Sequence, residues 1–369
     1  MRWNVAVYAI CKNEEAFVDR WMDSMGEADL VVVTDTGSDD HTIEKLRARG
    51  AQVFSETIPP WRFDEARNRS LTHVPKDVDI CVCTDLDEVF RPGWREKLEQ
   101  AWRSDTSNGR YLYNWSLKSD GSPDMQFVYA KIHARNGYRW RYPVHEYIEW
   151  TRPEPERKVF LDGVVLDHHP DPAKSRGSYL TLLETAVRED PQSERMRYYL
   201  GREYLYAGRW DACISTLKAY LELPSSTWAE ERAAAMRWIA KAHWQLGAHS
   251  EAYQWYYRAM GEAPWMRDAY VECAQMAYAL EDWHKVFFLT EEALQISGRS
   301  QNYVNMGYSW DETPDDLCVI ACYRLGMFAR AAEHAKKALA FAPQNSRLQN
   351  NLRLIKDRMS KPDAKKKQL

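Results

Sequence analysis

The sequence predicts two domains of different class, an α/β domain with a mainly parallel sheet over residues 1–175 and an all-α repeat domain over residues 176–356. The first half alternates short apolar runs with segments of helical spacing, which is the order of strands joined by crossover helices. From about Ser178 onward, similar helical segments recur along the chain. The last stretch, residues 357–369, is short and basic, and we expect it to be a disordered tail.

Composition is that of an ordinary globular protein. The 369 residues are 45% hydrophobic and 28% charged, with a formal net charge of -4. This net charge gives no overall positive surface for nucleic acid, so a nucleic-acid partner would need a local basic surface. The sixteen tryptophans and 21 tyrosines are unusual, and they indicate aromatic helix packing, sugar-stacking surfaces, or both.

The seven cysteines indicate a reduced core rather than a disulfide framework. They show no metal-finger spacing, and an odd number cannot all pair within the chain; they are Cys11, Cys81, Cys83, Cys213, Cys273, Cys318 and Cys322. The N-terminus begins directly with a strand pattern, and no later stretch is long and apolar enough for a membrane span. We therefore expect a cytoplasmic protein without a membrane span.

Four apolar runs predict the strands of a parallel sheet. They are residues 4–10, 30–34, 52–55 and 80–84, and segments with helical spacing separate them. Ligand sites in such sheets lie beyond the carboxyl ends of the strands. Beyond residue 87 the pattern changes to alternating strands at RYLYNWSLK and MQFVYAKIHA, which we expect to pair antiparallel around Asp120 and Gly121, and then to VFLDGVVLDHH.

The stretch ICVCTDLDEVF carries two carboxylates, Asp85 and Asp87, directly after a predicted buried strand. Carboxylate oxygens at that edge could hold Mg²⁺ or Mn²⁺ with open positions for substrate phosphates. A pair of acids separated by one residue is also common in solvated turns, so this pattern alone does not decide between the two.

The helical segments resemble tetratricopeptide repeats. Gly208, Gly247 and Gly326 fall between the two helices of a unit. The ends of units are marked by Pro224, Pro264 and Pro343. The spacing of about 39 residues exceeds the usual ~34, but the placement of small, aromatic and proline residues fits. Four imperfect helix pairs would form a short solenoid with a concave face; a generic helical domain is the alternative.

The first half resembles a family 2 glycosyltransferase of the GT-A fold. CKNEE, VVVTDTGSDDHT, FDEARN, TDLDEVF, VHE and DHH occur in the order found in that family, over about residues 4–175. The fusion to a repeat tail is similar to the bacterial peptide S-glycosyltransferases that modify cysteine in bacteriocins. The resemblance implies a metal-dependent, inverting enzyme that takes a sugar from a nucleotide-sugar donor, expected to be a UDP-sugar.

The resemblance implies a set of donor-binding residues at the ligand edge. Carboxylates there can accept hydrogen bonds from base and ribose groups, and an arginine can bind phosphate; the implied set is Cys11, Asn13, Glu14, Asp35, Arg67, Asn68, Asp85 and His145. Structural alternatives are helix N-terminal charge compensation for Glu14 and a surface ion pair of Arg67 with Asp64 or Glu65. The chain departs from the family where Thr36, rather than a second acid, follows Asp35.

The resemblance implies Asp87 as the first metal ligand, Asp85 acting through water or ribose, and His168 as a distal ligand, with Mn²⁺ or Mg²⁺ as the cofactor. The neighbouring His169 makes the assignment of the histidine ambiguous. Inversion at the sugar carbon also needs a general base, and Glu146 in PVHEYIEW is the candidate. Asp120, Asp124 and Glu149 remain rivals for that role.

The acceptor stays open at this stage. A helical repeat tail favours a peptide or protein acceptor, or a homodimer interface. A glycan such as lipopolysaccharide and a modified nucleic-acid base are alternatives, the latter through the aromatic and basic residues 139–142. A third hypothesis, of another class, is a non-catalytic scaffold with a degenerate transferase domain.

Overall fold

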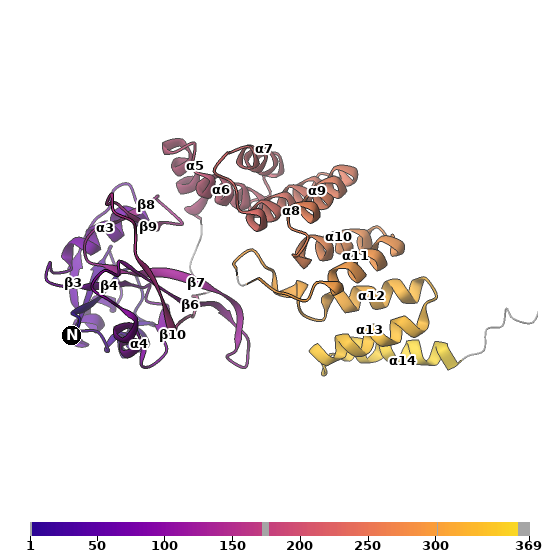
Figure 1. The fold of residues 1–369 in the computed structure, drawn as a ribbon, viewed down its shortest axis with the longest axis horizontal. Coiled ribbons are helices and arrows are strands. Elements are labelled where there is room, and N and C mark those ends of the chain that lie inside the picture. The colour runs from indigo at the N-terminus through magenta and orange to yellow at the C-terminus, as the bar shows by residue number, and fades with distance from the viewer. Residues whose placement is uncertain (1, 172–176, 301, 361–369) are drawn as a thin grey trace, which may run out of the picture. The chain divides into compact units, whose positions relative to one another are not determined.

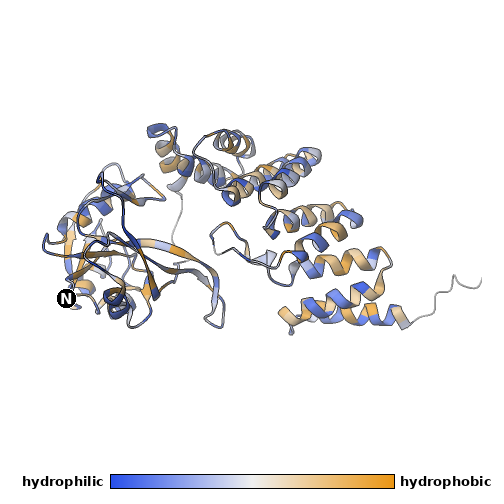
Figure 2. Cartoon of the chain, viewed as in Figure 1, coloured by the Kyte–Doolittle hydropathy of each residue, from blue (hydrophilic) through white to orange (hydrophobic). Residues whose placement is uncertain are grey.

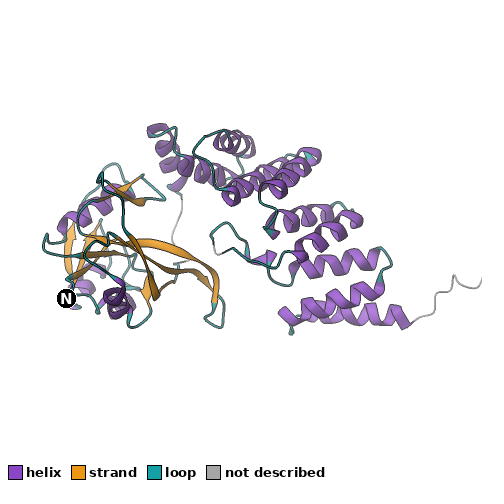
Figure 3. Cartoon of the chain, in the orientation of Figure 1, coloured by secondary structure: helices purple, strands orange, loops and turns teal. Residues whose placement is uncertain are grey.

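The structure is a computed structural model that describes residues 2–171, 177–300 and 302–360. It divides into two compact units, Met1–Pro191 and Gln192–Leu369. Figure 3 shows that the strands belong to the first unit and that the second is built from helices. The predicted order, a unit with strands followed by a helical unit, is therefore confirmed.

The first unit contains ten strands and five helices within the described residues. The strands are β1 (Val5–Cys11), β2 (Leu30–Asp35), β3 (Gln52–Ser55), β4 (Ile80–Cys83), β5 (Glu88–Phe90), β6 (Asn108–Leu117), β7 (Pro123–Ala134), β8 (Tyr138–Arg141), β9 (Tyr147–Trp150) and β10 (Lys158–His168). The helices are α1 (Val18–Met25), α2 (Thr42–Ala48), α3 (Phe63–His73), α4 (Trp94–Ala101) and α5 (Tyr179–Glu189).

The main sheet is mixed rather than mainly parallel, which corrects the expectation from the sequence. Its order is β3-β2-β1-β4-β7-β6-β10-β5. A separate pair consists of β8 and β9, which lie next to each other in Figure 1. The first four of these strands are parallel, and so are β6 and β10. β7 runs antiparallel to both β4 and β6, and β5 runs antiparallel to β10. The short turn between β6 and β7 enforces their reversal, since only antiparallel neighbours can be joined so briefly.

Both faces of the sheet are covered. On one face, alternate residues of β1 pack with Trp21 of α1, Leu46 of α2 and Leu98 of α4. On the other face, Tyr8 packs with Leu71 of α3 and Trp140 of β8. The strands are apolar on both sides because helices or strands cover both sides, as the continuous runs in the sequence predict.

The boundary between the units falls later than residue 175, because α5 packs on the first unit. Tyr179 of α5 contacts the rings of Phe63 and His145. At the end of the helix, Glu189 pairs with Arg62, with an oxygen–nitrogen distance of 2.7 Å. These contacts tie the predicted first helix of the repeat domain to the sheet domain instead.

The second unit is a tetratricopeptide-like array of helix pairs. Its elements are α6 (Glu194–Tyr206), α7 (Trp210–Leu221), α8 (Ala229–Gln245), α9 (His249–Glu262), α10 (Arg267–Ala279), α11 (Trp283–Gln295), the short 3₁₀ helix η1 (Gly307–Ser309), α12 (Thr313–Arg324), α13 (Phe328–Phe341) and α14 (Ser346–Ser360). Figure 2 shows that these helices carry both hydrophobic and hydrophilic residues, as expected where one face packs on a neighbour and the other does not.

The turn inside each helix pair uses the left-handed backbone region. Gly208, Gly247 and Gly326 have φ values of 69°, 73° and 77°, so glycine avoids the steric cost that a Cβ would add there. The third pair has Glu281 at this place, with φ 56°. The predicted glycine turns are therefore confirmed, and the missing third glycine corresponds to a residue that adopts the same conformation.

The structure also bears on the predictions about the C-terminal tail, the cysteines and a membrane span. α14 extends to Ser360, so residues 357–360 of the predicted tail are helical, while residues 361–369 lie outside the described residues. All seven cysteines are free and buried, as predicted. Among the described residues, none of the helices has the length and apolar character needed to cross a membrane.

A buried hydrogen-bond chain in the first unit generates a pH prediction. Trp140 Nε1 donates to Tyr8 Oη at 2.8 Å, and Tyr8 Oη lies 2.8 Å from His133 Nε2. Burial lowers the pKa of His133 from 6.5 to about 4. His133 takes up a proton near pH 6.5 in the unfolded chain, but only near pH 4 in the folded chain.

We expect the free energy of unfolding to fall as pH drops from about 6.5 to 4, by about 3 kcal/mol from this residue. Urea unfolding of the wild type and of His133→Gln across this range measures it. The variant should be less stable at neutral pH, with a flatter pH dependence. A matched control is His284→Gln, at an exposed position of α11; equal slopes for the wild type and His133→Gln would contradict the assignment.

Candidate functional site

The carboxyl ends of β1, β2 and β4 meet at one edge of the sheet. Cys11 of β1 is in register with Asp35 of β2, and Tyr8 of β1 is in register with Cys83 of β4. The residues that follow these strands therefore lie along the same edge, as parallel pairing requires. Most of the candidate residues from the sequence fall on this edge.

The loops after β1 and β2 are joined by hydrogen bonds. Asp35 accepts from the backbone nitrogen of Ser38 at 3.1 Å and from the Cys11 thiol at 3.6 Å. Asn13 accepts from the backbone of Asp39 at 2.9 Å, and the Glu14 backbone donates to Thr42 at 2.7 Å. Cys11, Asn13, Glu14 and Asp35 are thus brought together, and the described contacts of Asn13 and Asp35 fix the shape of these loops.

Arg67 is the central cation of the site. Its side chain, on α3, is almost fully buried at 3% exposure. Nη2 donates to Asp85 Oδ1 at 2.8 Å, and Nε donates to Glu146 Oε1 at 2.6 Å. The guanidinium also lies 5.0 Å from the ring centroid of Trp140. The structural alternative, a surface pair with Asp64 or Glu65, does not form; Asp64 instead binds Arg62.

A second buried cation, Lys131, faces the same carboxylate. Lys131 Nζ, on β7, lies 3.4 Å from Asp85 Oδ2 and 3.6 Å from Glu88 Oε1. Burial acts to lower the pKa of Lys131, but Asp85 and Glu88 outweigh it and raise that pKa well above its ordinary value. Likewise burial opposes the charge of Arg67, but Asp85 and Glu146 raise its pKa overall. Both cations therefore stay charged.

Sequence reasoning missed Lys131 and Glu88. Glu88 accepts from Tyr113 Oη at 2.8 Å and, through its other oxygen, from the Asp85 backbone at 2.9 Å; burial raises the pKa of this carboxyl. The available signals were a lysine inside the apolar run MQFVYAKIHA and a third acid directly after Asp87. A buried charge in a strand needs a partner, which would have pointed to the pair.

Asp87 and His168 lie together at the junction of β5 and β10. His168 Nε2 is 3.7 Å from Asp87 Oδ2, and Nδ1 lies 3.0 Å from the Trp115 carbonyl oxygen, which fixes the ring. The indole of Trp115 stacks on the imidazole at 4.7 Å between centroids. His169 is held by its backbone, which donates to the Asp87 carbonyl at 2.8 Å. The structure thus favours His168 over its neighbour as the partner of Asp87.

Asp85 lies beside two buried cations. Within the described residues, Asp85, Asp87 and His168 are not grouped within a span of 4.8 Å, the distance that would suit one ion. Its two oxygens face Arg67 and Lys131 instead. Of the three predicted ligands, Asp87 and His168 face each other, whereas the carboxylate of Asp85 faces two buried cations.

Asn68 and His145 have structural contacts. The Asn68 amide donates to the Trp140 carbonyl at 2.9 Å and accepts from the Trp140 backbone nitrogen at 2.8 Å. This pair of hydrogen bonds joins β8 to α3. His145 adopts φ 50° next to Glu146, and its ring lies edge-on to Tyr179.

Glu146 lies nearer to this cluster than its rivals for the role of base. Its side chain is 10% exposed and pairs with Arg67. Asp120 accepts from the Ser122 backbone at 2.9 Å in the β6–β7 turn, and Asp124 accepts from Ser116 at 3.0 Å near the same turn. Glu149 is occupied by Arg139 and Arg141, each within 2.9 Å.

The site carries more negative than positive charge. Three carboxylates face two buried cations, and a fourth, Asp87, faces His168; the three acids are Asp85, Glu88 and Glu146, and the cations are Arg67 and Lys131. A diphosphate approaching this edge would be repelled unless a divalent cation offset the acids. Carboxylate and imidazole from Asp87 and His168 are a suitable pair for Mn²⁺ or Mg²⁺ with positions left for substrate.

Comparison with known proteins concerns the helical half. The tetratricopeptide repeat family model matches residues 198–264, which span most of α6 and all of α7, α8 and α9. Similar solved structures include MamA, at 17% identity and TM-score 0.36, covering 46% of this chain and 89% of that one.

Two further structures are similar at the same level. One is TTC0263, a tetratricopeptide protein of Thermus thermophilus, at 16% identity and TM-score 0.35, covering 48% of this chain and 89% of that one. The other is yeast Tom70, at 15% identity and TM-score 0.38, covering 51% of this chain and 37% of that one. The family match and the helix pairs together identify the second unit as a tetratricopeptide-like domain.

The buried ion pairs of Arg67 generate a stability prediction. Arg67→Met should lower the free energy of unfolding of the first unit by about 3–5 kcal/mol, because Asp85 and Glu146 lose a shared partner in a poorly solvated place. Urea unfolding measures the loss. Arg69→Met, on the exposed side of the same helix, removes only surface pairs with Glu65 and Glu56 and should cost below about 1 kcal/mol; an equal loss in both variants would contradict the role of Arg67.

Proposed function

We propose that the first unit is an inverting glycosyltransferase that uses a divalent metal and takes its sugar from a nucleotide-sugar, with a UDP-sugar as the expected donor. The observation that carries this proposal is the meeting of Asp87 and His168 at 3.7 Å beside the Arg67–Asp85 pair, at the carboxyl edge of a sheet. The order of the six sequence motifs that resemble family 2 glycosyltransferases supports it.

The donor diphosphate is proposed to bind between these groups. Mn²⁺ or Mg²⁺ held by Asp87 and His168 would neutralise the charge that develops on the departing diphosphate. Arg67 and Lys131 hold Asp85 in one position, and Asp85 is left to accept a hydrogen bond from the donor rather than to ligate the ion. The joined loops after β1 and β2, with Asn13, Glu14 and Asp35, are the proposed base and ribose contacts.

Glu146 is the proposed general base. Its ion pair uses Oε1 on Arg67, and a carboxylate held in this way has a defined direction toward the acceptor. A hydroxyl acceptor needs proton removal as the sugar carbon is attacked, whereas a thiol acceptor depends on this less because a thiolate forms readily. The loss of transfer rate on replacing Glu146 should therefore be larger for a hydroxyl acceptor than for a thiol acceptor.

The acceptor is proposed to be a peptide or protein. Tetratricopeptide-like helices commonly bind extended or helical segments of partners, and the second unit supplies such helices. A glycan and a modified nucleic-acid base are the alternatives with the same chemistry.

A non-catalytic scaffold is the second candidate function. The observation that favours it is the family match, which falls wholly within the helical half. The scaffold and enzyme hypotheses differ in whether the chain turns over a nucleotide-sugar, so one assay separates them.

Asp87→Ala should abolish donor chemistry. We expect the wild type to hydrolyse one member of a panel of nucleotide-sugars slowly with Mn²⁺, and the variant to lose at least about 100-fold in turnover because it loses a ligand of the ion. Release of free nucleotide measures this. Asp124→Asn, on β7 with a contact to Ser116, is the control and should keep its activity. Absence of both turnover and nucleotide binding in the wild type would favour the scaffold.

Glu146→Gln should separate donor binding from transfer. Intact-mass measurement on candidate peptides, glycans and DNA with a nucleotide-sugar mixture first identifies the acceptor. With a hydroxyl acceptor, the variant should lose about 10²–10⁴-fold in kcat with little change in the KM for the donor. Glu149→Gln, which removes the pairs with Arg139 and Arg141, is the matched control. Near-normal transfer by Glu146→Gln to an alcohol at neutral pH would rule out its role as base.

A further inference from the structure

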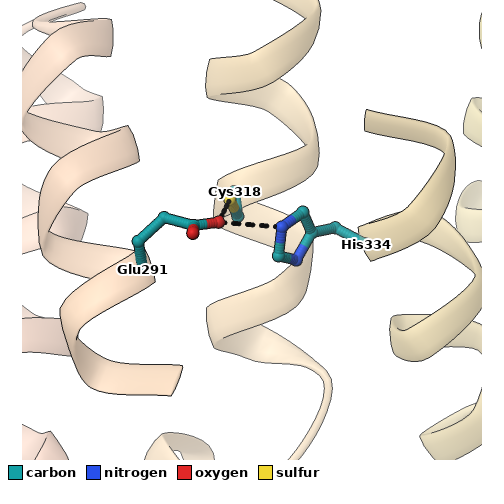
Figure 4. Close-up of side chains that lie close together, drawn as sticks. All are labelled: Glu291, Cys318 and His334. Atoms are coloured by element: carbon teal, nitrogen blue, oxygen red, sulfur yellow. Dashed lines mark hydrogen bonds and ion pairs between the residues drawn. The ribbon is translucent and has the colours of Figure 1, made fainter. Parts of the chain in front are cut away.

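A cluster of metal-binding side chain types lies in the helical unit, away from the residues discussed above. Glu291 of α11, Cys318 of α12 and His334 of α13 come from three consecutive helices and point toward one another (Figure 4). One ligand atom from each lies within 4.8 Å of the others. Cys318 and His334 are buried, and Glu291 is partly exposed.

The distances are close to those between two ligands of one zinc ion. Cys318 Sγ lies 3.6 Å from Glu291 Oε1, and His334 Nε2 lies 2.9 Å from the same oxygen. Ligands bound at about 2.0–2.3 Å in a tetrahedron are roughly 3.3–3.8 Å apart. A small outward movement of the three side chains would therefore admit an ion.

The histidine is oriented as zinc-bound histidines are. His334 Nδ1 lies 2.7 Å from Asp315 Oδ1, and Asp315 is buried at 3% exposure. A carboxylate on one ring nitrogen fixes the tautomer and directs the other nitrogen at the ion. Asp315 and Cys318 are three residues apart on α12, so the helix places both on one face.

The types of ligand select the ion. A thiolate, an imidazole and a carboxylate suit Zn²⁺, whereas Mg²⁺ and Ca²⁺ prefer oxygen alone. Cys322 Sγ lies 3.9 Å from Cys318 Sγ, one helical turn further on, but it is not within 4.8 Å of all three ligand atoms, so a water would complete four ligands. Arg330 pairs with Glu291 Oε2 and leaves Oε1 facing the cluster.

We propose that Glu291, Cys318 and His334 bind one zinc ion, which links α11, α12 and α13. The site is independent of the transferase proposal, because it uses none of the residues at the sheet edge. Its expected role is structural: the ion would fix the packing of the last repeats, and zinc binding would add to the stability of this part of the chain.

A proton is the competitor for this place. His334 lies between two carboxylates, with Nδ1 2.7 Å from Asp315 Oδ1 and Nε2 2.9 Å from Glu291 Oε1. Without an ion, a protonated imidazole between Asp315 and Glu291 would hold the cluster together. Zinc must displace that proton and the thiol proton of Cys318, so binding should release protons and tighten as pH rises.

The test uses the full chain, freed of metal with a chelator and then titrated with Zn²⁺. We expect one equivalent to bind in a manner that depends on Cys318, with release of protons and a rise in the melting temperature of the helical unit; any zinc held at the sheet edge would be lost in Asp87→Ala instead. Co²⁺ in place of Zn²⁺ should give a thiolate-to-cobalt charge-transfer absorption. Cys318→Ser should lose this absorption, and Asp315→Asn should bind about 10–100-fold more weakly because His334 is no longer oriented.

Two controls make the outcome decisive. Cys213→Ser changes a buried cysteine of α7 and should keep both the binding and the absorption. Asp87→Ala, at the sheet edge, should also keep the zinc binding that depends on Cys318. Circular dichroism checks that each variant folds. Failure of the wild type to bind Zn²⁺ at micromolar concentration, or equal binding by Cys318→Ser, would overturn the proposal and leave the protonated histidine as the occupant.

Discussion

The ion pairs of Arg67 are the constraint on which the candidate site depends. One buried guanidinium joins Asp85, which follows β4, to Glu146, which precedes β9, and it also lies on Trp140 of β8. Segments far apart in the sequence are thereby held at one point of the sheet edge. A charge buried to this extent is tolerated only when its partners are in place, so the loops around it have little freedom.

The same network gives Asp85, Asp87 and Glu88 different contacts. Asp85 is held by two cations, Glu88 is buried against Lys131 and Tyr113, and Asp87 faces His168. Carboxylates that follow one another within four residues therefore have three different environments. Asp85 and Asp87 lie in the short connection between β4 and β5, whereas Glu88 is the first residue of β5, which pairs with β10.

The helical unit has a cluster of ionisable side chains between its last helices. Its repeats pack through small and apolar residues, as where Gly201 allows Leu217 to approach α6 closely. Within the last repeats, however, three ionisable side chains converge between helices, and Asp315 supports one of them. The sequence indicates only a core position for Cys318 and Cys322, because His334 and Glu291 lie on other helices and no short spacing connects them to the cysteines.

Sequence alone determined the order of the two units, the first four parallel strands, the glycine turns of the repeats and the set of residues at the sheet edge. Local patterns carry this information, since strand alternation, helix periodicity and turn chemistry act over a few residues. Only the tertiary structure decided the order of the strands in the sheet, that α5 belongs to the first unit, and that Lys131 and Glu88 complete the charge network. It also separated Asp85 from the Asp87–His168 pair. These features depend on contacts between distant segments, and the burial of charge that selects them arises only when the chain is folded.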